Sequence, residues 1–460
     1  MKFYNRKKEL KVLENVYKSA KVKMQTVVIH GRRRIGKTEL VKQFATKHSK
    51  NSFYLFVEIK DEQITLNDME EVFSDKLDFT PRFNNWEDFF AFLGKYKKED
   101  PMVIIFDEFQ NFSRINKGLF TKFQKYIDEL QDEKIMLILI GSYVGLMKKI
   151  FMDRKEPLFG RADRIIKLKP FNFFEASKMM KDAGINSLRD RISIYGILDG
   201  IPKYLRYLFE LDTNDTGKII KKLFLDPTAP LFEEGKNILV QEFGSEHKGY
   251  FSILEAIAAG NTKPGEIANF VSQNGFRKYI NELKEKYEVI KRIIPVTRSK
   301  NTTKSRYELS DNFYKFWFRY VYKNHTGIEF MPDKVFDRIK KDLPVYEGKI
   351  YENICTQYLL ENIMADDFVV SKYGRWWSKD DEIDIVIMDK RNKQIIFGEC
   401  KYRNKKTSKS EIKTLIDRTK KVNWYNSERK EKLYFFSKSG FTQKAIEYCE
   451  ETGIMRKTML

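Results

Sequence analysis

One segment near the N-terminus limits the folds open to this chain more than any other. Residues 30–40 have the sequence HGRRRIGKTEL, which contains the pattern G-x-x-x-x-G-K-[ST]. The apolar residues 26–29 before it predict a short strand, and residues 39–47 after it predict a helix. In such a loop, glycines let backbone N–H groups surround a phosphate at the positive end of a helix dipole. Strand, loop and helix together predict a P-loop that binds a nucleoside triphosphate.

The residue types in this loop assign roles within the predicted site. We expect Lys37 to reach the β- and γ-phosphates and the Thr38 hydroxyl to hold Mg²⁺. Backbone or side-chain contacts to the nucleotide are predicted for the whole loop, namely Gly31, Arg32, Arg33, Arg34, Ile35, Gly36, Lys37, Thr38 and Glu39.

A second segment supplies the acids that hydrolysis needs. Residues 101–108, PMVIIFDE, are a continuous apolar run that ends in Asp107 and Glu108. Such a run is typical of a strand buried on both faces of a parallel sheet, and ligands bind at the carboxyl ends of these strands. We expect Asp107 to hold Mg²⁺, directly or through water, and Glu108 to polarise the water that attacks the γ-phosphate.

Two further features favour an ATPase site but have alternative explanations. The apolar residues 135–140 predict another strand, after which Ser142 is either a sensor of the γ-phosphate or a plain helix N-cap. Arg161 and Arg164 precede a further predicted strand. Either one is a candidate arginine finger, and we select Arg161, but both are also compatible with an ordinary basic surface.

Five motifs in order give the chain a family resemblance. FYNRKKELKVL, GRRRIGKT, FDEFQ, the Gly-Ser pair and GIPKYL together resemble the archaeal-type ATPase family, a STAND-like branch of P-loop ATPases close to AAA+ proteins. The resemblance implies that ATP is the nucleotide, that Asn5 and Arg6 lie near the adenine, and that Pro202 covers the nucleotide from a helical lid. It also implies a nuclease-like C-terminal domain.

Composition indicates a multidomain protein with an anionic partner. The 460 residues include 86 Lys and Arg against 65 Asp and Glu, a formal net charge of +21. This excess favours nucleic acid first and an anionic membrane surface second. No apolar run approaches the about 20 residues of a spanning helix, and the N-terminus lacks a signal-peptide core, so we expect a cytoplasmic protein. The three scattered cysteines predict neither a disulfide framework nor a zinc site.

The predicted fold class is α/β, with four domains. Residues 1–170 form the P-loop ATPase core with a parallel sheet, and residues 171–241 form the helical lid, because apolar periodicity there is helical. Residues 242–330 form a winged helix-turn-helix and residues 340–460 an α/β domain similar to PD-(D/E)xK nucleases.

The winged helix is predicted from three helical segments followed by two strands around the basic loop TRSKNTTKSR. A third helix over residues 276–286 is sized for a DNA major groove, while the loop can reach phosphates. Double-stranded DNA is therefore the favoured partner. Docking of a protein or of a second copy of the chain is the alternative. The aromatic residues 313–318 predict a packed domain interface.

The last domain carries candidate metal ligands. Strands over residues 382–388 and 394–402 must form a hairpin that turns near Arg391, which sets Asp384 opposite Glu399. Lys401 shares a strand face with Glu399. With Glu352 on the preceding helix, this set resembles the PD-(D/E)xK site, although Ile383 replaces its proline. Glu352, Asp384 and Glu399 would hold Mg²⁺ or Mn²⁺, and Asp384, Glu399 and Lys401 would be catalytic.

Two functional hypotheses follow from these sites. In the first, ATP binding and hydrolysis control the binding of nucleic acid, and the C-terminal domain cleaves it with a metal. In the second, the ATPase is a signalling switch of the STAND type, and the winged helix and last domain only bind DNA or protein. The charged hairpin of the last domain is compatible with both.

Overall fold

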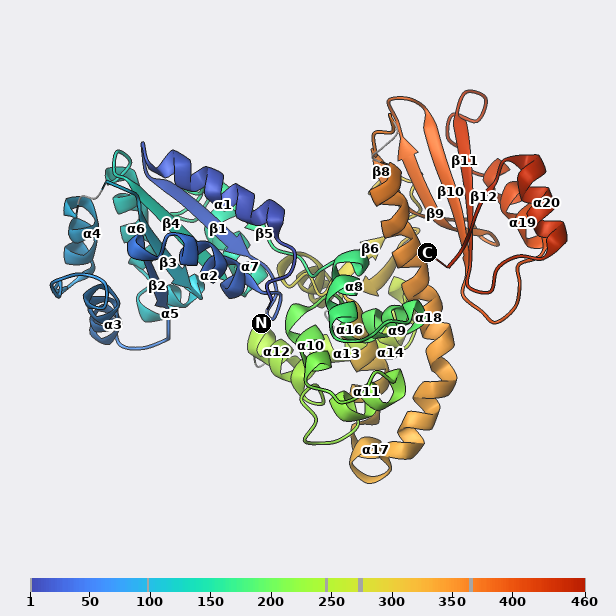
Figure 1. Cartoon of the computed structure of the whole chain (residues 1–460), viewed down its shortest axis with the longest axis horizontal. Coiled ribbons are helices and arrows are strands. Elements are labelled where there is room, and N and C mark those ends of the chain that lie inside the picture. Colours follow the sequence, from blue (N-terminus) through green and yellow to red (C-terminus); the bar gives the residue numbers. More distant parts are fainter. Residues whose placement is uncertain (1, 97–98, 245–246, 272–275, 364–366, 460) are drawn as a thin grey trace. The chain divides into compact units, whose positions relative to one another are not determined.

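A computed structural model describes residues 2–96, 99–244, 247–271, 276–363 and 367–459 (Figure 1). The chain divides into two compact units. The first comprises residues 1–170 with the short segments Ile201–Arg206 and Glu285–Glu288, and the second comprises the remainder. In the described part of the chain, every helix is too short or too polar to span a bilayer.

The first unit is built on a parallel five-stranded sheet, as predicted. Its strand order is β2-β3-β4-β1-β5, and all four neighbouring pairs are parallel. Strands β1, β3 and β4 are buried along their whole length, which explains their unbroken apolar sequences. The strands are β1 (Gln25–His30), β2 (Ser52–Phe56), β3 (Met102–Asp107), β4 (Ile135–Gly141) and β5 (Arg164–Lys167).

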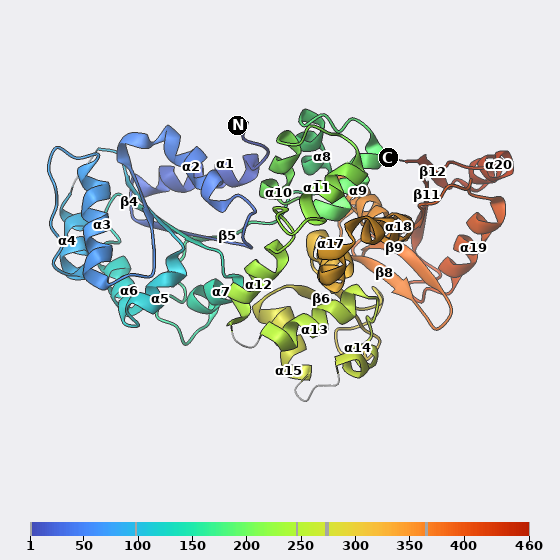
Figure 2. The ribbon, with the colours of Figure 1, turned by 90° about the horizontal axis from the view of Figure 1, so that it is seen from below.

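Helices cover both faces of this sheet (Figure 2). One core joins the sheet to the first two helices and contains Leu13, Leu40 and Phe44. The other is rich in aromatic rings and contains Phe73, Trp86 and the side chains of the later helices. The helices are α1 (Lys7–Ala20), α2 (Lys37–Lys47), α3 (Glu62–Ser74), α4 (Trp86–Lys95), α5 (Phe112–Ile115), α6 (Leu119–Glu129), α7 (Val144–Met152) and α10 (Pro202–Arg206), with short 3₁₀ turns at η1 (Ser49–Asn51) and η2 (Phe109–Asn111).

The second unit begins with the helices predicted for the lid. Its first helix starts at a capping box in which Asn172 and Glu175 satisfy each other's backbone N–H groups. The helices are α8 (Phe173–Asp182), α9 (Leu188–Leu198), η3 (Tyr207–Phe209), α11 (Thr216–Phe224) and α12 (Glu234–Phe243). The aromatic residues 313–318 are buried with them: Phe313, Phe316 and Trp317 have no exposed surface, in agreement with a packed interface.

The elements predicted for a winged helix occur in the expected order, although the assignment of that fold remains a prediction. Three helices, α13 (His247–Ala258), α14 (Pro264–Val271) and α15 (Phe276–Asn281), precede an antiparallel pair, β6 (Ile290–Ile293) and β7 (Arg306–Leu309). The predicted helix over residues 276–286 ends in a π-helical turn, η5 (Glu282–Lys286). The following elements are α16 (Asn312–Phe316), η6 (Trp317–Val321), η7 (Tyr322–Asn324) and α17 (His325–Phe330).

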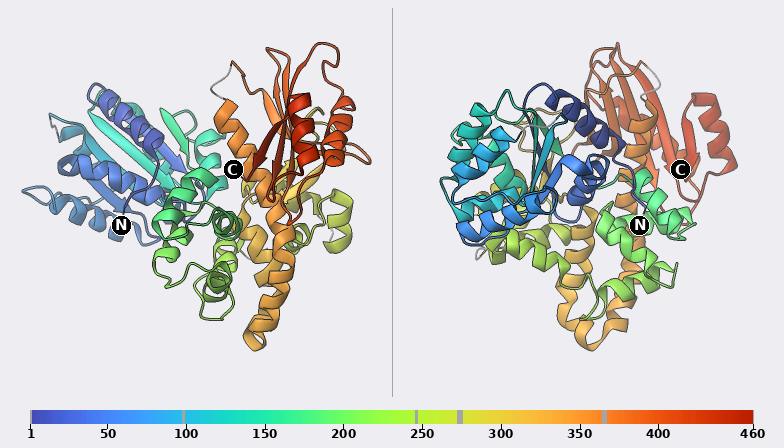
Figure 3. Two further views of the ribbon diagram at one scale, coloured as in Figure 1. Left: turned by 45° about the vertical axis from the view of Figure 1, so that its right-hand side comes forward. Right: turned by 60° about the vertical axis from the view of Figure 1, so that its left-hand side comes forward.

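A separate C-terminal α/β domain ends the chain, as predicted. Its sheet has the order β12-β11-β10-β9-β8, antiparallel at β8, β9 and β10 and parallel beyond (Figure 3). Its first helix begins at Pro332, earlier than expected, because the helix continues through Pro344. The elements are α18 (Pro332–Ile363), β8 (Lys372–Trp377), β9 (Glu382–Asp389), β10 (Gln394–Lys401), α19 (Lys409–Lys420), β11 (Lys430–Ser437), α20 (Gln443–Thr452) and β12 (Met455–Thr458).

Candidate functional site

The P-loop connects the end of β1 to the start of α2 and has the backbone that phosphate binding requires. Gly36, with φ 86°, is the N-cap of α2 in the left-handed region that favours glycine. At Gly31 a Cβ atom would lie 2.5 Å from the backbone oxygen of Leu168, so only glycine fits. These two glycines let the backbone between them turn tightly, as it must around a phosphate.

The lysine and threonine of the loop are already oriented. Lys37 is buried, and its Nζ donates hydrogen bonds of 2.9 Å to the carbonyl oxygens of Gly31 and Arg32. The Thr38 hydroxyl donates to Oδ2 of Asp107 at 2.6 Å. The tip of β3 therefore faces the start of α2, with one hydroxyl and one carboxylate side by side, which is the oxygen pair that Mg²⁺ takes beside a P-loop.

Asp107 has a second fixed partner that sequence reasoning missed. The Tyr54 hydroxyl of β2 donates to the same Oδ2 atom at 2.7 Å. Burial, followed by the charge of Asp107, raises the pKa of Tyr54, so the phenol remains a neutral donor. The carboxylate is thus held by donors from two elements. Tyr54 comes close to Asp107 because β2 pairs with β3, and the sequence carries no signal of that pairing.

Glu108 lies just beyond β3 and leaves the strand direction with a positive φ of 57°. Its Oε1 accepts a hydrogen bond of 2.7 Å from Ser142, and its Oε2 accepts one from Gln110. Ser142 therefore contacts the candidate catalytic acid directly. The N-cap of α7 is Tyr143, so Ser142 lies one residue before the cap position. Gln110 ends the FDEFQ motif, but no role was predicted for it.

The other residues predicted to contact the nucleotide differ in their surroundings. Arg6 donates to the carbonyl oxygens of Ile35 and Lys169 at 3.1 and 2.7 Å, so it braces the loop. Beside it, the buried Nδ2 of Asn5 has no hydrogen-bond partner among the described residues.

Pro202 lies against the loop, since its Cγ would be 3.9 Å from a Cβ at Gly36. Arg33 donates a hydrogen bond of 2.9 Å to the Tyr143 hydroxyl. Arg34 and Glu39 are exposed at the loop surface.

The structure does not bring Arg161 to this site. Its guanidinium makes two hydrogen bonds, of 3.0 and 3.3 Å, to the carboxylate of Asp128 on α6. It precedes β5, whose first residue Arg164 pairs with Val27 near the beginning of β1, whereas the P-loop follows the end of that strand. Arg161 therefore lies toward the opposite end of the strands from this chain's own P-loop.

Comparison with known proteins agrees with this geometry. The family described as "ATPase domain predominantly from Archaea" matches residues 3–208. The uncharacterized protein MJECL04 of Methanocaldococcus jannaschii is 33% identical over 413 residues, which cover 88% of each chain. The chain belongs to the archaeal-type ATPase family. Residues 317–414 also match the family described as "Archaea bacterial proteins of unknown function".

A solved structure shows the same fold. The Walker-type ATPase PABY2304 of Pyrococcus abyssi superposes with a TM-score of 0.51, covering 69% of this ATPase and 96% of that chain at 19% identity. A second, shorter protein of Methanocaldococcus jannaschii, MJ0424, is 38% identical over 82 residues, which are 17% of this chain and 79% of its own.

We expect Lys37→Ala to weaken ATP binding by about 100-fold, because a buried ammonium and its charge-assisted hydrogen bonds to phosphate are worth about 3 kcal/mol. Titration with a fluorescent ATP analogue measures this. Lys47→Ala removes an exposed lysine from the same helix and is the matched control. Equal affinities of the two variants would show that Lys37 is not the phosphate ligand.

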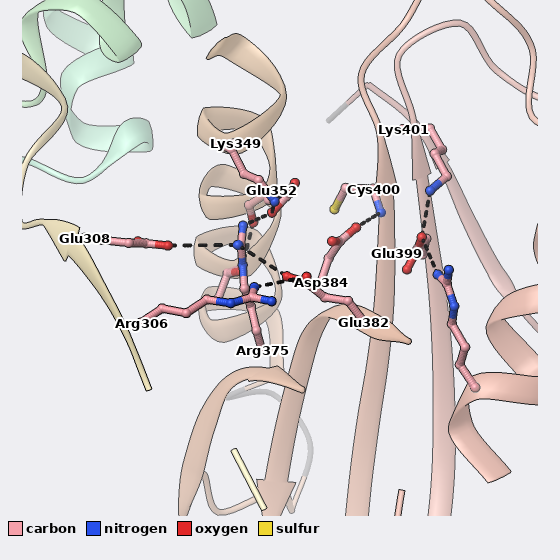
Figure 4. Close-up of polar contacts among 12 residues, drawn as sticks. Arg306, Glu308, Lys349, Glu352, Arg375, Glu382, Asp384, Glu399, Cys400 and Lys401 are labelled. Atoms are coloured by element: carbon pink, nitrogen blue, oxygen red, sulfur yellow. Dashed lines mark hydrogen bonds and ion pairs between the residues drawn. The ribbon is translucent and has the colours of Figure 1, made fainter. Parts of the chain in front are cut away.

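The C-terminal domain of this ATPase contains a second polar centre, in which the predicted hairpin register is observed. Strands β9 and β10 pair from Asp389 with Gln394 to Ile385 with Gly398, so Asp384 and Glu399 are next in register. Their carboxylates have different partners (Figure 4). Asp384 accepts from the backbone N–H of Cys400 at 3.0 Å, while Glu399 accepts from Lys401 at 2.7 Å and from Arg418 at 3.3 Å.

Burial and a neighbouring charge raise the pKa values of two carboxyl groups in this centre. Burial, and then the nearby charge of Asp384, raise the pKa of Glu399 to about 7. Its Oε2 atom is buried and has no hydrogen-bond partner among the described residues. Glu352 of α18 is influenced by Asp384 in the same way, and its pKa is also raised.

The three predicted metal ligands do not form one compact group. Glu352 pairs with Arg375 and, at 3.1 Å, with Lys349, rather than joining Asp384 and Glu399. In the described ranges, no three histidine, cysteine, aspartate or glutamate side chains are arranged to hold a metal ion. The residues of this centre, as they stand, do not fit a three-carboxylate metal site. A metal here remains a prediction.

Proposed function

We propose that this ATPase hydrolyses ATP with Mg²⁺ at its P-loop and uses the nucleotide state to control binding of double-stranded DNA. The observation that carries the first half is the Thr38–Asp107 pair at 2.6 Å, adjacent to Glu108. When bound there, Mg²⁺ would neutralise charge on the β- and γ-phosphates. The orphan Nδ2 of Asn5 supports the adenine contact implied for that residue.

Three side chains, Lys37, Glu108 and Ser142, have separate roles in hydrolysis. Lys37 exchanges its bonds to loop carbonyls for phosphate oxygens, which costs little because the ammonium is already buried at the loop. Glu108 accepts a proton from the attacking water. Ser142 donates a hydrogen bond to Glu108, so it is positioned to couple binding of the γ-phosphate to the orientation of that acid.

Exposed cations on the loop between β6 and β7 support the DNA partner. Arg298, Lys300 and Lys304 are exposed, and the chain carries a net charge of +21. Arg306 was also predicted to reach phosphates. Instead it pairs with Glu382 at 3.1 Å, and its guanidinium lies 4.6 Å from the centre of the Trp377 ring. We therefore assign phosphate contacts to the first three cations alone.

We expect duplex DNA binding to weaken steeply with salt, because phosphate contacts release condensed counterions. Replacing Arg298, Lys300 and Lys304 by Gln should weaken binding and reduce the slope of log affinity against log salt by roughly 0.9 per lost contact. Fluorescence anisotropy at several salt concentrations measures both. A control with the same loss of charge replaces three exposed lysines elsewhere in the same unit, Lys178, Lys181 and Lys340.

Unchanged DNA affinity in the loop variant would favour the alternative partner. The segment from α13 to β7 would then dock a protein or a second copy of the chain. A second copy would also give Arg161 access to another chain's nucleotide, which is the arrangement in which an arginine finger acts in trans. Light scattering with and without ATP detects such assembly.

The second function we propose is metal-dependent cleavage of nucleic acid at the C-terminal centre, which requires Glu352 to leave Arg375 and Lys349 and join the other two carboxylates. It is supported by the register of Asp384 and Glu399 and by the contact of Glu399 with Lys401. If the centre does not cut, the ATPase is a regulatory switch whose C-terminal domain only binds.

A further inference from the structure

An arginine that no motif marks lies in the C-terminal centre. Arg375 belongs to β8, and its side chain is 18% exposed. Its Nη2 pairs with Glu352 of α18, and its Nη1 lies 3.5 Å from Glu382 of β9 and 3.9 Å from Glu308 of β7. Carboxylates from three elements therefore surround one guanidinium (Figure 4).

The carboxylates near Arg375 stabilise the positive charge of its guanidinium. Burial alone would lower its pKa, but the carboxylates of Glu352, Glu308, Glu382 and Asp384 raise it. Arginine remains charged in any protein site, and its planar fork bridges two carboxylates. Glu352 and Asp384 repel each other, so a fixed cation beside them relieves a cost that would otherwise require a proton or a metal.

The β6–β7 hairpin helps to hold this arginine. The backbone N–H of Val296 donates to the carbonyl oxygen of Arg375 at 2.8 Å, and the Val296 side chain belongs to the core of the C-terminal domain. Glu308 provides a carboxylate, and Arg306 fixes Glu382 at 3.1 Å. Both the main chain and the side chain of Arg375 are thus tied to the same hairpin that carries the exposed cations.

We propose that Arg375 is a built-in counter-cation that occupies the electrostatic place of a divalent metal beside Glu352 and Asp384, and that the β6–β7 hairpin keeps it there. This inference rests on the proposed role of the centre in phosphodiester chemistry. It explains why the three predicted metal ligands are not grouped, because Glu352 is already paired with the guanidinium of Arg375. A metal can bind these carboxylates only after Arg375 leaves or is removed.

Manganese binding to the full-length protein, without nucleotide, tests the proposal. Free Mn²⁺ is counted by electron paramagnetic resonance during titration of wild type and of Arg375→Gln. We expect the variant to bind one additional Mn²⁺ per chain, at least about tenfold more tightly than the wild type at this centre. That ratio corresponds to about 1.4 kcal/mol. The P-loop contributes equally to both proteins.

Three variants make the test specific. Arg375→Gln with Asp384→Asn should lose the additional ion, and Arg391→Gln, on the exposed β9–β10 turn, should match the wild type. Arg375→Lys keeps the charge but not the planar fork, so its Mn²⁺ affinity should be intermediate, and it tests the proposal even if Arg375→Gln does not fold.

An Arg375→Lys protein, or a folded Arg375→Gln protein, that binds no more Mn²⁺ than the wild type would overturn the proposal. DNA binding measured on the same samples separates this failure from that of the proposed function. The hairpin cations Arg298, Lys300 and Lys304 do not depend on Arg375 for their charge. Loss of the manganese effect with DNA binding intact refutes only the inference.

Discussion

Replacing Glu108 by Gln will leave ATP bound while slowing its hydrolysis by about 100- to 1000-fold. The amide has the shape of the carboxylate and can keep a hydrogen bond from Ser142, which now reaches Oε1 at 2.7 Å. It cannot accept the proton of the attacking water, because a neutral amide is a very weak base. Affinity should therefore be preserved, since Lys37 and Thr38 are untouched.

Two measurements on the same sample check this expectation: nucleotide affinity by titration and turnover by phosphate release. Glu71→Gln, an exposed change on α3, is the matched control and should hydrolyse ATP at the wild-type rate. A Glu108→Gln protein that also turns over at that rate would assign the catalytic base to another group. Loss of ATP affinity in this variant would instead point to a structural defect.

The parts of this ATPase that could be predicted from sequence are those fixed by local rules. The P-loop glycines require their own backbone geometry, and the apolar run before Asp107 requires a strand buried on both faces. The position of Glu399 opposite Asp384 follows from a short turn at Arg391, because the register of a hairpin is set by its turn.

The parts that could not be predicted depend on side chains that meet across the fold. Tyr54 reaches Asp107 only because β2 and β3 are neighbours, and no spacing in the sequence indicates that. Arg375 is one arginine among many in a basic chain, and its neutralising role arises where β7, β8 and α18 come together. The last domain was expected to begin at residue 340, yet α18 begins at Pro332 and continues through Pro344, since tertiary packing can offset one lost backbone hydrogen bond.

Substitutions in the C-terminal centre should reduce DNA cleavage about as strongly as Glu108→Gln reduces ATP hydrolysis. Cleavage of DNA should require Mg²⁺ or Mn²⁺ and stop on chelation. It should fall by at least about 100-fold in Asp384→Ala, Glu399→Ala and Lys401→Ala, with ATP hydrolysis unchanged. Lys401 donates to Glu399 at 2.7 Å, so losing either residue breaks this pair, although Glu399 would keep its contact with Arg418. Asp417→Ala, an exposed change on α19, is the control.

Cleavage should be measured in both the wild type and Arg375→Gln, because Arg375 neutralises Glu352 in the arrangement observed. Wild type should cut slowly and Arg375→Gln faster, and both need assays with and without ATP, since nucleotide is proposed to control the output. If neither protein cuts DNA or RNA with either metal, while the three alanine variants bind nucleic acid as the wild type does, the centre is not catalytic. Glu399, Lys401 and Arg418 would then be a structural ion-pair cluster, and the ATPase would act as a switch whose C-terminal domain only binds.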